Sequence, residues 1–144
     1  MKVLLFSALL VSMAMATIEV DFRNSSYLLP KKGFTIEVGE LIEIYAPEKP
    51  SAGNVWLVRP LEAEFVYDIF NNTFVFSPKE NDEDMVGEDG YRKIELIGVD
   101  VGEGEFMMAY TKIWDFEGFD NISEDREDVE GLKKFKIKVI NPSS

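Results

Sequence analysis

The stretch Phe34-Thr35-Ile36-Glu37-Val38-Gly39-Glu40-Leu41-Ile42-Glu43-Ile44 carries the pattern that decides the fold. Apolar residues at positions 34, 36 and 38 alternate with polar ones, and the alternation resumes at 42 and 44 after a Gly-Glu break. The same period of two returns near the other end of the chain, where Phe135, Ile137 and Val139 alternate with lysines. Such alternation is typical of antiparallel strands that are buried on one face.

Short apolar runs between these two ends predict further strands. They cover Ile18–Arg23, Val55–Val58, Phe65–Phe70, Thr73–Phe76, Tyr91–Val99 and Phe106–Ile113. Asn71-Asn72 separates two of the runs and favours a tight hairpin turn. Helical periodicity never lasts beyond about two turns. The sequence therefore predicts an all-β protein, an immunoglobulin-like antiparallel β-sandwich with about eight strands.

The first sixteen residues have the pattern of a secretory signal peptide. Lys2 precedes an apolar run from Val3 to Met15, and Ala14-Met15-Ala16 is a small-residue cleavage pattern. The run is short for a membrane span, and a buried N-terminal helix is the alternative. We expect residues 1–16 to be the signal peptide and residues 17–144 to be a single domain on the secretory route, destined for a lysosome, a phagosome or the outside.

Composition narrows the function further. A net charge of −12 argues against nucleic acid and against anionic membrane surfaces as partners, since both are negatively charged. The chain has no cysteine, so the domain must be stable without disulfides. Three sequons, at Asn24, Asn71 and Asn121, are candidate N-glycosylation sites.

The absence of both His and Cys removes most catalytic chemistry. It excludes Ser–His and Cys–His catalysis and zinc sites built on imidazole or thiolate. An acidic cluster that includes Asp82, Asp84, Glu88 and Asp89 raises the question of calcium, but Val86 and Lys93 break the helix–loop–helix calcium pattern. We expect no enzyme activity, no cofactor and no metal.

Three segments interrupt the strand pattern: Pro47–Asn54, Glu80–Gly90 and Trp114–Gly131. Long loops on a rigid sandwich often carry binding function, and solvated linkers are the alternative. Trp56 lies within an apolar run and is expected in the core, whereas Trp114 follows a strand and starts a loop.

Several motifs resemble the chagasin family of inhibitors of papain-like cysteine peptidases. Val38–Ile44 is similar to the family's opening strand pair, and Phe135–Val139 fits its closing strand. Lys49-Pro50-Ser51-Ala52-Gly53 resembles the first inhibitory loop, Asn-Pro-Thr-Thr-Gly. Gly87-Glu88-Asp89-Gly90 resembles the second, Gly-x-Gly-Gly, and Lys112-Ile113-Trp114 resembles the third, Arg-Pro-Trp. The resemblance covers about Gly33 to Ile140, and an amoebiasin-like member with a signal peptide is similar in pattern.

The resemblance implies a reversible, non-covalent inhibitor that inserts three loops into the active-site cleft of a papain-like cysteine peptidase. We expect a monomer, with Trp114 as the strongest single contact. The peptidase-binding residues implied are Lys49, Pro50, Ser51, Ala52, Gly53, Gly87, Glu88, Asp89, Gly90, Lys112, Ile113 and Trp114. An immunoglobulin-like adhesive or carbohydrate-binding module is the alternative, which predicts an aromatic platform on a sheet face or bound calcium. A glycosidase with two carboxylates in a cleft is a third interpretation.

Overall fold

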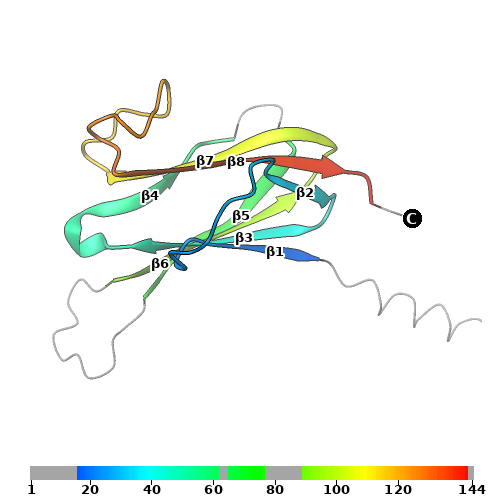
Figure 1. Ribbon diagram of the computed structural model, residues 1–144, viewed down its shortest axis with the longest axis horizontal. Coiled ribbons are helices and arrows are strands. Elements are labelled where there is room, and N and C mark those ends of the chain that lie inside the picture. The colour runs from blue at the N-terminus through cyan, green and yellow to red at the C-terminus, as the bar shows by residue number, and fades with distance from the viewer. Residues whose placement is uncertain (1–15, 62–64, 77–88, 143–144) are drawn as a thin grey trace, which may run out of the picture.

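The computed structural model describes residues 16–61, 65–76 and 89–142, which form two stacked four-stranded sheets (Figure 1). Sheet A has the strand order β1-β3-β6-β5, and sheet B has the order β2-β8-β7-β4. The strands are β1 (Thr17–Asp21), β2 (Phe34–Glu37), β3 (Leu41–Glu48), β4 (Asn54–Val58), β5 (Tyr67–Phe76), β6 (Gly90–Gly98), β7 (Gly102–Lys112) and β8 (Gly131–Ile140). The prediction of an all-β sandwich with about eight strands is confirmed.

Two strand pairs depart from the antiparallel expectation. β1 pairs with β3 in parallel, and β2 pairs with β8 in parallel. In both pairs the strand at the edge of the sheet is short, and the remaining four ladders are antiparallel. The alternation of side chains cannot reveal this, because a strand of either direction buries one face with the same period of two.

The predicted hairpin turn at Asn71-Asn72 is wrong. β5 runs through both asparagines as one strand, paired with β6, with a bulge between Ile69 and Asn71. Side-chain partners on β6 hold them in the sheet: Asn71 Nδ2 donates to Glu95 Oε1 at 2.7 Å, and Arg92 Nη1 donates to Asn72 Oδ1 at 3.4 Å. The two predicted strands on either side of the turn are therefore one.

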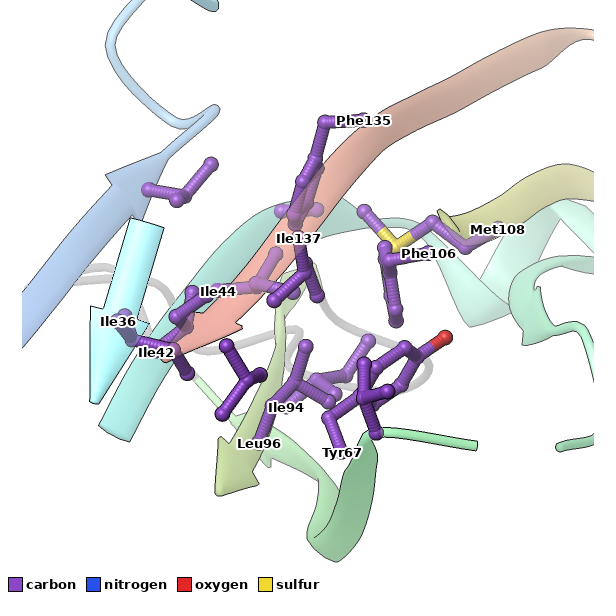
Figure 2. Close-up of a cluster of buried hydrophobic side chains, with 14 of the residues drawn as sticks. Ile36, Ile42, Ile44, Tyr67, Ile94, Leu96, Phe106, Met108, Phe135 and Ile137 are labelled. Carbon is purple, nitrogen blue, oxygen red and sulfur yellow. The ribbon is translucent and has the colours of Figure 1, made fainter. Parts of the chain in front are cut away.

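The core lies between the two sheets and is built from the alternating apolar positions (Figure 2). Sheet A supplies Ile42, Ile44, Ile94 and Leu96, all fully buried. Sheet B supplies residues that include Phe106, Met108, Phe135, Ile137 and Val139. Trp56 is 7% exposed and belongs to this core, as predicted. Within the described residues, no helix is long and apolar enough to cross a membrane.

Candidate functional site

The strand register brings three connections to one end of the sandwich. The first connection joins β3 to β4, the middle one joins β5 to β6, and the third joins β7 to β8. Gly90 at the start of β6 pairs with Glu48 at the end of β3 and with Phe76 at the end of β5. Asn54 at the start of β4 pairs with Lys112 at the end of β7. Figure 1 shows the first and third connections at the end of the sandwich away from the C-terminus. We call this the loop end.

The first connection is a short, well-defined turn. Pro50–Ala52 form a single 3₁₀ turn with proline at its start. Gly53 closes it in the left-handed region, at φ +86°, and its N–H donates to Pro50 O at 2.9 Å. Proline fixes one backbone angle and glycine accepts the other, so this turn has little conformational freedom left to lose. Ser51 and Ala52 are exposed at its tip.

A buried carboxylate holds the base of the first connection. Glu48 is 1% exposed and accepts a hydrogen bond from the backbone N–H of Trp56 at 2.6 Å. Arg92 on β6 donates to the same carboxylate twice, from Nε at 3.1 Å and from Nη2 at 2.6 Å. One side chain therefore ties together the strand before the turn, the strand after it, and the strand that follows the middle connection.

Two aromatic side chains brace the same turn from beneath. The backbone N–H of Lys49 donates to the Tyr110 hydroxyl at 2.8 Å, and Trp56 Nε1 donates to Pro47 O at 2.8 Å. The two rings pack together with centroids 4.9 Å apart. Burial raises the pKa of Tyr110, so this hydroxyl stays neutral over the physiological range. The residues that lead into the turn are therefore anchored to aromatic side chains of β4 and β7.

Glu48, Arg92 and Tyr110 were missed as site residues by the sequence analysis. A signal for Glu48 exists, because position 48 continues the inward-facing series 42, 44, 46 along β3. A charged side chain that faces the core needs a partner. Arg92 faces the core side of β6, because it lies two residues before the buried Ile94. The alternation therefore marks both side chains as inward-facing charges, whereas their contact with each other follows from the β3–β6 register.

The third connection presents two large apolar side chains to solvent. Ile113 is 63% exposed and Trp114 is 69% exposed. Both lie in a turn closed by the hydrogen bond from Asp115 N to Lys112 O, at 3.0 Å. The six-membered ring of Trp114 lies against Gly53, which brings the first and third connections into contact. Lys112 itself is half-buried in the β7 ladder.

The rest of the third connection is organised around Arg126. Its guanidinium donates to Asp128, to Gly118 O at 2.6 Å and to Asp120 O at 3.3 Å, and lies over the ring of Phe116. Glu117 N donates to Asp128 Oδ2 at 2.7 Å. Arg126 holds the pKa of Asp128 below its ordinary value through these hydrogen bonds. Residues 116–128 thus form a small unit with its own network, which we call the Arg126 lobe.

The middle connection is described only at its base. Gly87 and Glu88 lie outside the described residues, as do Asp82 and Asp84 of the acidic cluster. Asp89 is half-buried, and Gly90 is the first residue of β6. A side chain at Gly90 would collide with the carbonyl of Val75, so β5 and β6 approach closely there. Within the part of the chain that the structure describes, no group of three acidic, His or Cys residues is placed to hold a metal ion.

The three sequons occupy different settings. Asn24 and Asn121 are exposed in turns, and Asn121 adopts a left-handed backbone with φ of 59°. Asn71 is half-buried in β5 and its amide is engaged by Glu95. The two exposed asparagines are therefore sterically better placed for a glycan.

The outer face of sheet A bears on the carbohydrate-binding alternative. Tyr45 and Tyr91 lie side by side there, with centroids 5.9 Å apart. The guanidinium of Arg23 covers both rings, at 4.4 and 4.5 Å from their centroids, and Asp21 pairs with it at 2.8 Å. This tyrosine pair is therefore not open for stacking a sugar ring.

Comparisons with known proteins place the chain in a family. A search of curated proteins finds no match. Among solved structures, the chain is similar to the cysteine protease inhibitor EhICP2 from Entamoeba histolytica, with a TM-score of 0.59 and 16% identity over 88% of this chain and 97% of that one. It is also similar to amebosin, with a TM-score of 0.50 and 20% identity over 88% of this chain and 99% of that one. The family model "Chagasin family peptidase inhibitor I42" matches residues 35–138, and the chain therefore belongs to the chagasin family of peptidase inhibitors and is not an enzyme.

Proposed function

We propose that this chain is a reversible, non-covalent inhibitor of papain-like cysteine peptidases that inserts the loop end of its sandwich into the active-site cleft. One observation carries the proposal: the strand register gathers the bases of all three connections at one end, where Trp114 and the Ser51-Ala52 tip are exposed. The name of the similar Entamoeba protein, a cysteine protease inhibitor, supports the choice of peptidase class.

The first turn is suited to the centre of a narrow cleft. Its tip residues, Ser51 and Ala52, are small, and Pro50 and Gly53 restrict its backbone. A loop already held in its bound shape loses little entropy on docking. A small side chain over the catalytic thiol fills space without offering a carbonyl for attack, which accounts for an inhibitor that is not cleaved.

We propose that the other two connections contact the peptidase on either side of the first. Trp114 supplies the large exposed ring that interface hot spots favour, with Ile113 beside it. Asp89 and Gly90 form the base of the middle connection. The proposed contact set is Lys49, Pro50, Ser51, Ala52, Gly53, Gly87, Glu88, Asp89, Gly90, Lys112, Ile113 and Trp114.

The route to the target is part of the proposal. A signal peptide over residues 1–16 would deliver the inhibitor to the secretory pathway, and from there to a lysosome, a phagosome or the outside. Cleavage after Ala16 would leave Thr17, the first residue of β1, as the mature N-terminus. The mature domain would then begin with a residue that pairs with Leu41 in the sheet. We also propose that the mature domain acts as a monomer.

Titration of purified residues 17–144 against active papain tests the function. We expect peptide hydrolysis to fall to zero at a defined stoichiometry and to recover after dilution. Mass spectrometry after prolonged incubation with excess papain should show an intact inhibitor. Undiminished hydrolysis at micromolar inhibitor would refute the proposed function, and rapid cleavage between Lys49 and Asn54 would make the chain a substrate.

A further inference from the structure

Gly53 and Trp114 approach more closely than a side chain at position 53 would allow. A methyl group built on Gly53 would lie 2.5 Å from Cη2 of Trp114, 3.2 Å from Cζ2 and 3.4 Å from Cζ3. Carbon atoms that do not bond keep about 3.5–4.0 Å apart. The outer edge of the indole therefore occupies the space that a Cβ would need.

The backbone of Gly53 does not by itself explain this contact. Gly39 and Gly118 also lie in the left-handed region, at φ of +93° and +96°, yet a methyl group on either would meet nothing within 4 Å. Gly53, at φ +86°, has the same left-handed backbone, and in addition the Trp114 ring leaves no room for a side chain there. The absence of a side chain at position 53 has a packing role.

The two ends of Trp114 are fixed independently. Its backbone lies in the turn closed by Asp115 N and Lys112 O, at 3.0 Å. Lys112 pairs with Asn54, the residue after Gly53, so the ladder places this turn beside the first connection. The far edge of the ring then rests on Gly53. With a backbone fixed by the turn and a ring fixed by the neighbouring loop, a side chain that is 69% exposed still has a defined direction.

We propose that Gly53 is a positioning residue: it seats the indole of Trp114, so that the first and third connections dock as one rigid unit. The inference rests on the proposed function, because it assigns to Gly53 a role in presenting Trp114 to the peptidase. Preorganisation of an anchor residue reduces the ordering cost of binding. A side chain at position 53 displaces the ring, because the ring edge can move more readily than the ladder can.

The test compares Gly53→Ala with Gly39→Ala, which carries the same backbone strain at the opposite end of the sandwich without the ring contact. The first readout is the order parameter of the Trp114 indole N–H from ¹⁵N relaxation in the free protein. We expect it to fall in Gly53→Ala and to match the parent in Gly39→Ala. The second readout is the inhibition constant for papain, which we expect to rise about tenfold in Gly53→Ala and to stay within about twofold in Gly39→Ala.

A double-mutant cycle with Trp114→Ala distinguishes displacement of the ring from backbone strain at position 53. In the Trp114→Ala background, Gly53→Ala should raise the inhibition constant by less than about threefold, because no ring remains to displace. Equal effects of Gly53→Ala in both backgrounds, or an unchanged indole order parameter, would overturn the inference. Failure of the parent to inhibit papain would refute the proposed function alone, because the relaxation measurement still decides whether Gly53 seats the ring.

Discussion

The first and third connections lie side by side at the loop end, but they are held in shape by different means. The first is a single turn whose anchors belong to the sandwich: the buried Glu48 carboxylate and the Tyr110 hydroxyl. The third is long, and the Arg126 lobe within it draws most of its hydrogen bonds from residues 117–128, with one tie to the sandwich from the buried Thr111 hydroxyl to Asp128 O. The short loop uses the core as its support, whereas most of the long loop supplies its own.

Because of this difference, substitutions in the two connections should affect different properties of the protein. Removing an anchor of the first connection should lower the free energy of unfolding, because a buried polar or charged group then loses its hydrogen-bond partner. Removing an anchor of the third connection loosens one exposed lobe and leaves both sheets intact. Stability should therefore fall when an anchor of the first connection is removed. Removal of the exposed part of the third connection should weaken inhibition and leave stability nearly unchanged.

The largest effect on stability is expected from Glu48→Ala. The change leaves Arg92 without the carboxylate that it contacts twice, and leaves the N–H of Trp56 without an acceptor. Breaking a buried pair by removing one partner costs about 3 kcal/mol or more. Urea denaturation followed by Trp fluorescence should show this loss in the free energy of unfolding.

Glu43→Ala is the matched control for this change. Glu43 lies on the same strand but faces outward, where its carboxylate accepts one hydrogen bond from the Tyr45 hydroxyl at 2.6 Å. A partly exposed hydrogen bond to a carboxylate is worth about 1.5 kcal/mol, roughly half of the loss expected for the buried pair. If the two substitutions cost the same, the first connection is not anchored through Glu48 and the contrast with the third connection fails.

The sequence predicts those features that depend on the period of two. The alternation in 34–44 and 135–139 identifies core strands, and the apolar neighbours of Trp56 predict its burial. The end of the predicted strand at Ile113 places Trp114 at the start of a loop, although β7 ends one residue earlier, at Lys112. These predictions succeed because each depends on a residue and its immediate neighbours.

Features that depend on pairing are not predictable in this way. The parallel partners of β1 and β2 are distant in sequence, and the bulged strand through Asn71 depends on Glu95 across the ladder. The contact between Gly53 and Trp114 likewise requires the β4–β7 register. Local propensity cannot supply such information, because tertiary partners decide these conformations.

Trp114→Ala is expected to have the opposite profile to Glu48→Ala. The ring is mostly exposed, so the free energy of unfolding should change by less than about 0.5 kcal/mol. Loss of a large anchor from the interface should raise the inhibition constant for papain at least about tenfold, or 1.4 kcal/mol. Enzyme inhibition and urea denaturation of the same preparation measure both quantities.

Leu28→Ala serves as the comparison for Trp114→Ala, because Leu28 is a highly exposed apolar residue outside the three connections. It should leave the inhibition constant unchanged. An inhibition constant for Trp114→Ala within twofold of the parent, with the fold intact, would show that the third connection does not supply the main contact. Exposure of a ring at the loop end would then be no guide to binding.

The smallest effect concerns the response of the Arg126 lobe to acid. Hydrogen bonds from Arg126 hold the pKa of Asp128 below its ordinary value of 3.8, so the folded lobe favours the charged carboxylate. A lowered folded pKa contributes stability that is complete above about pH 4 and is lost as the pH falls through the folded value. The amide proton of Glu117, which donates to Asp128, should report this in NMR spectra with a titration midpoint below 3.8.

The amide of Gly53 donates to a backbone carbonyl that does not titrate, so its shift should stay constant over the same range if the first connection is independent of the lobe. Asp128→Asn should abolish the Glu117 titration, and its persistence in that variant would assign it to another carboxylate and leave the lobe without the ionic anchor that distinguishes it from the first connection.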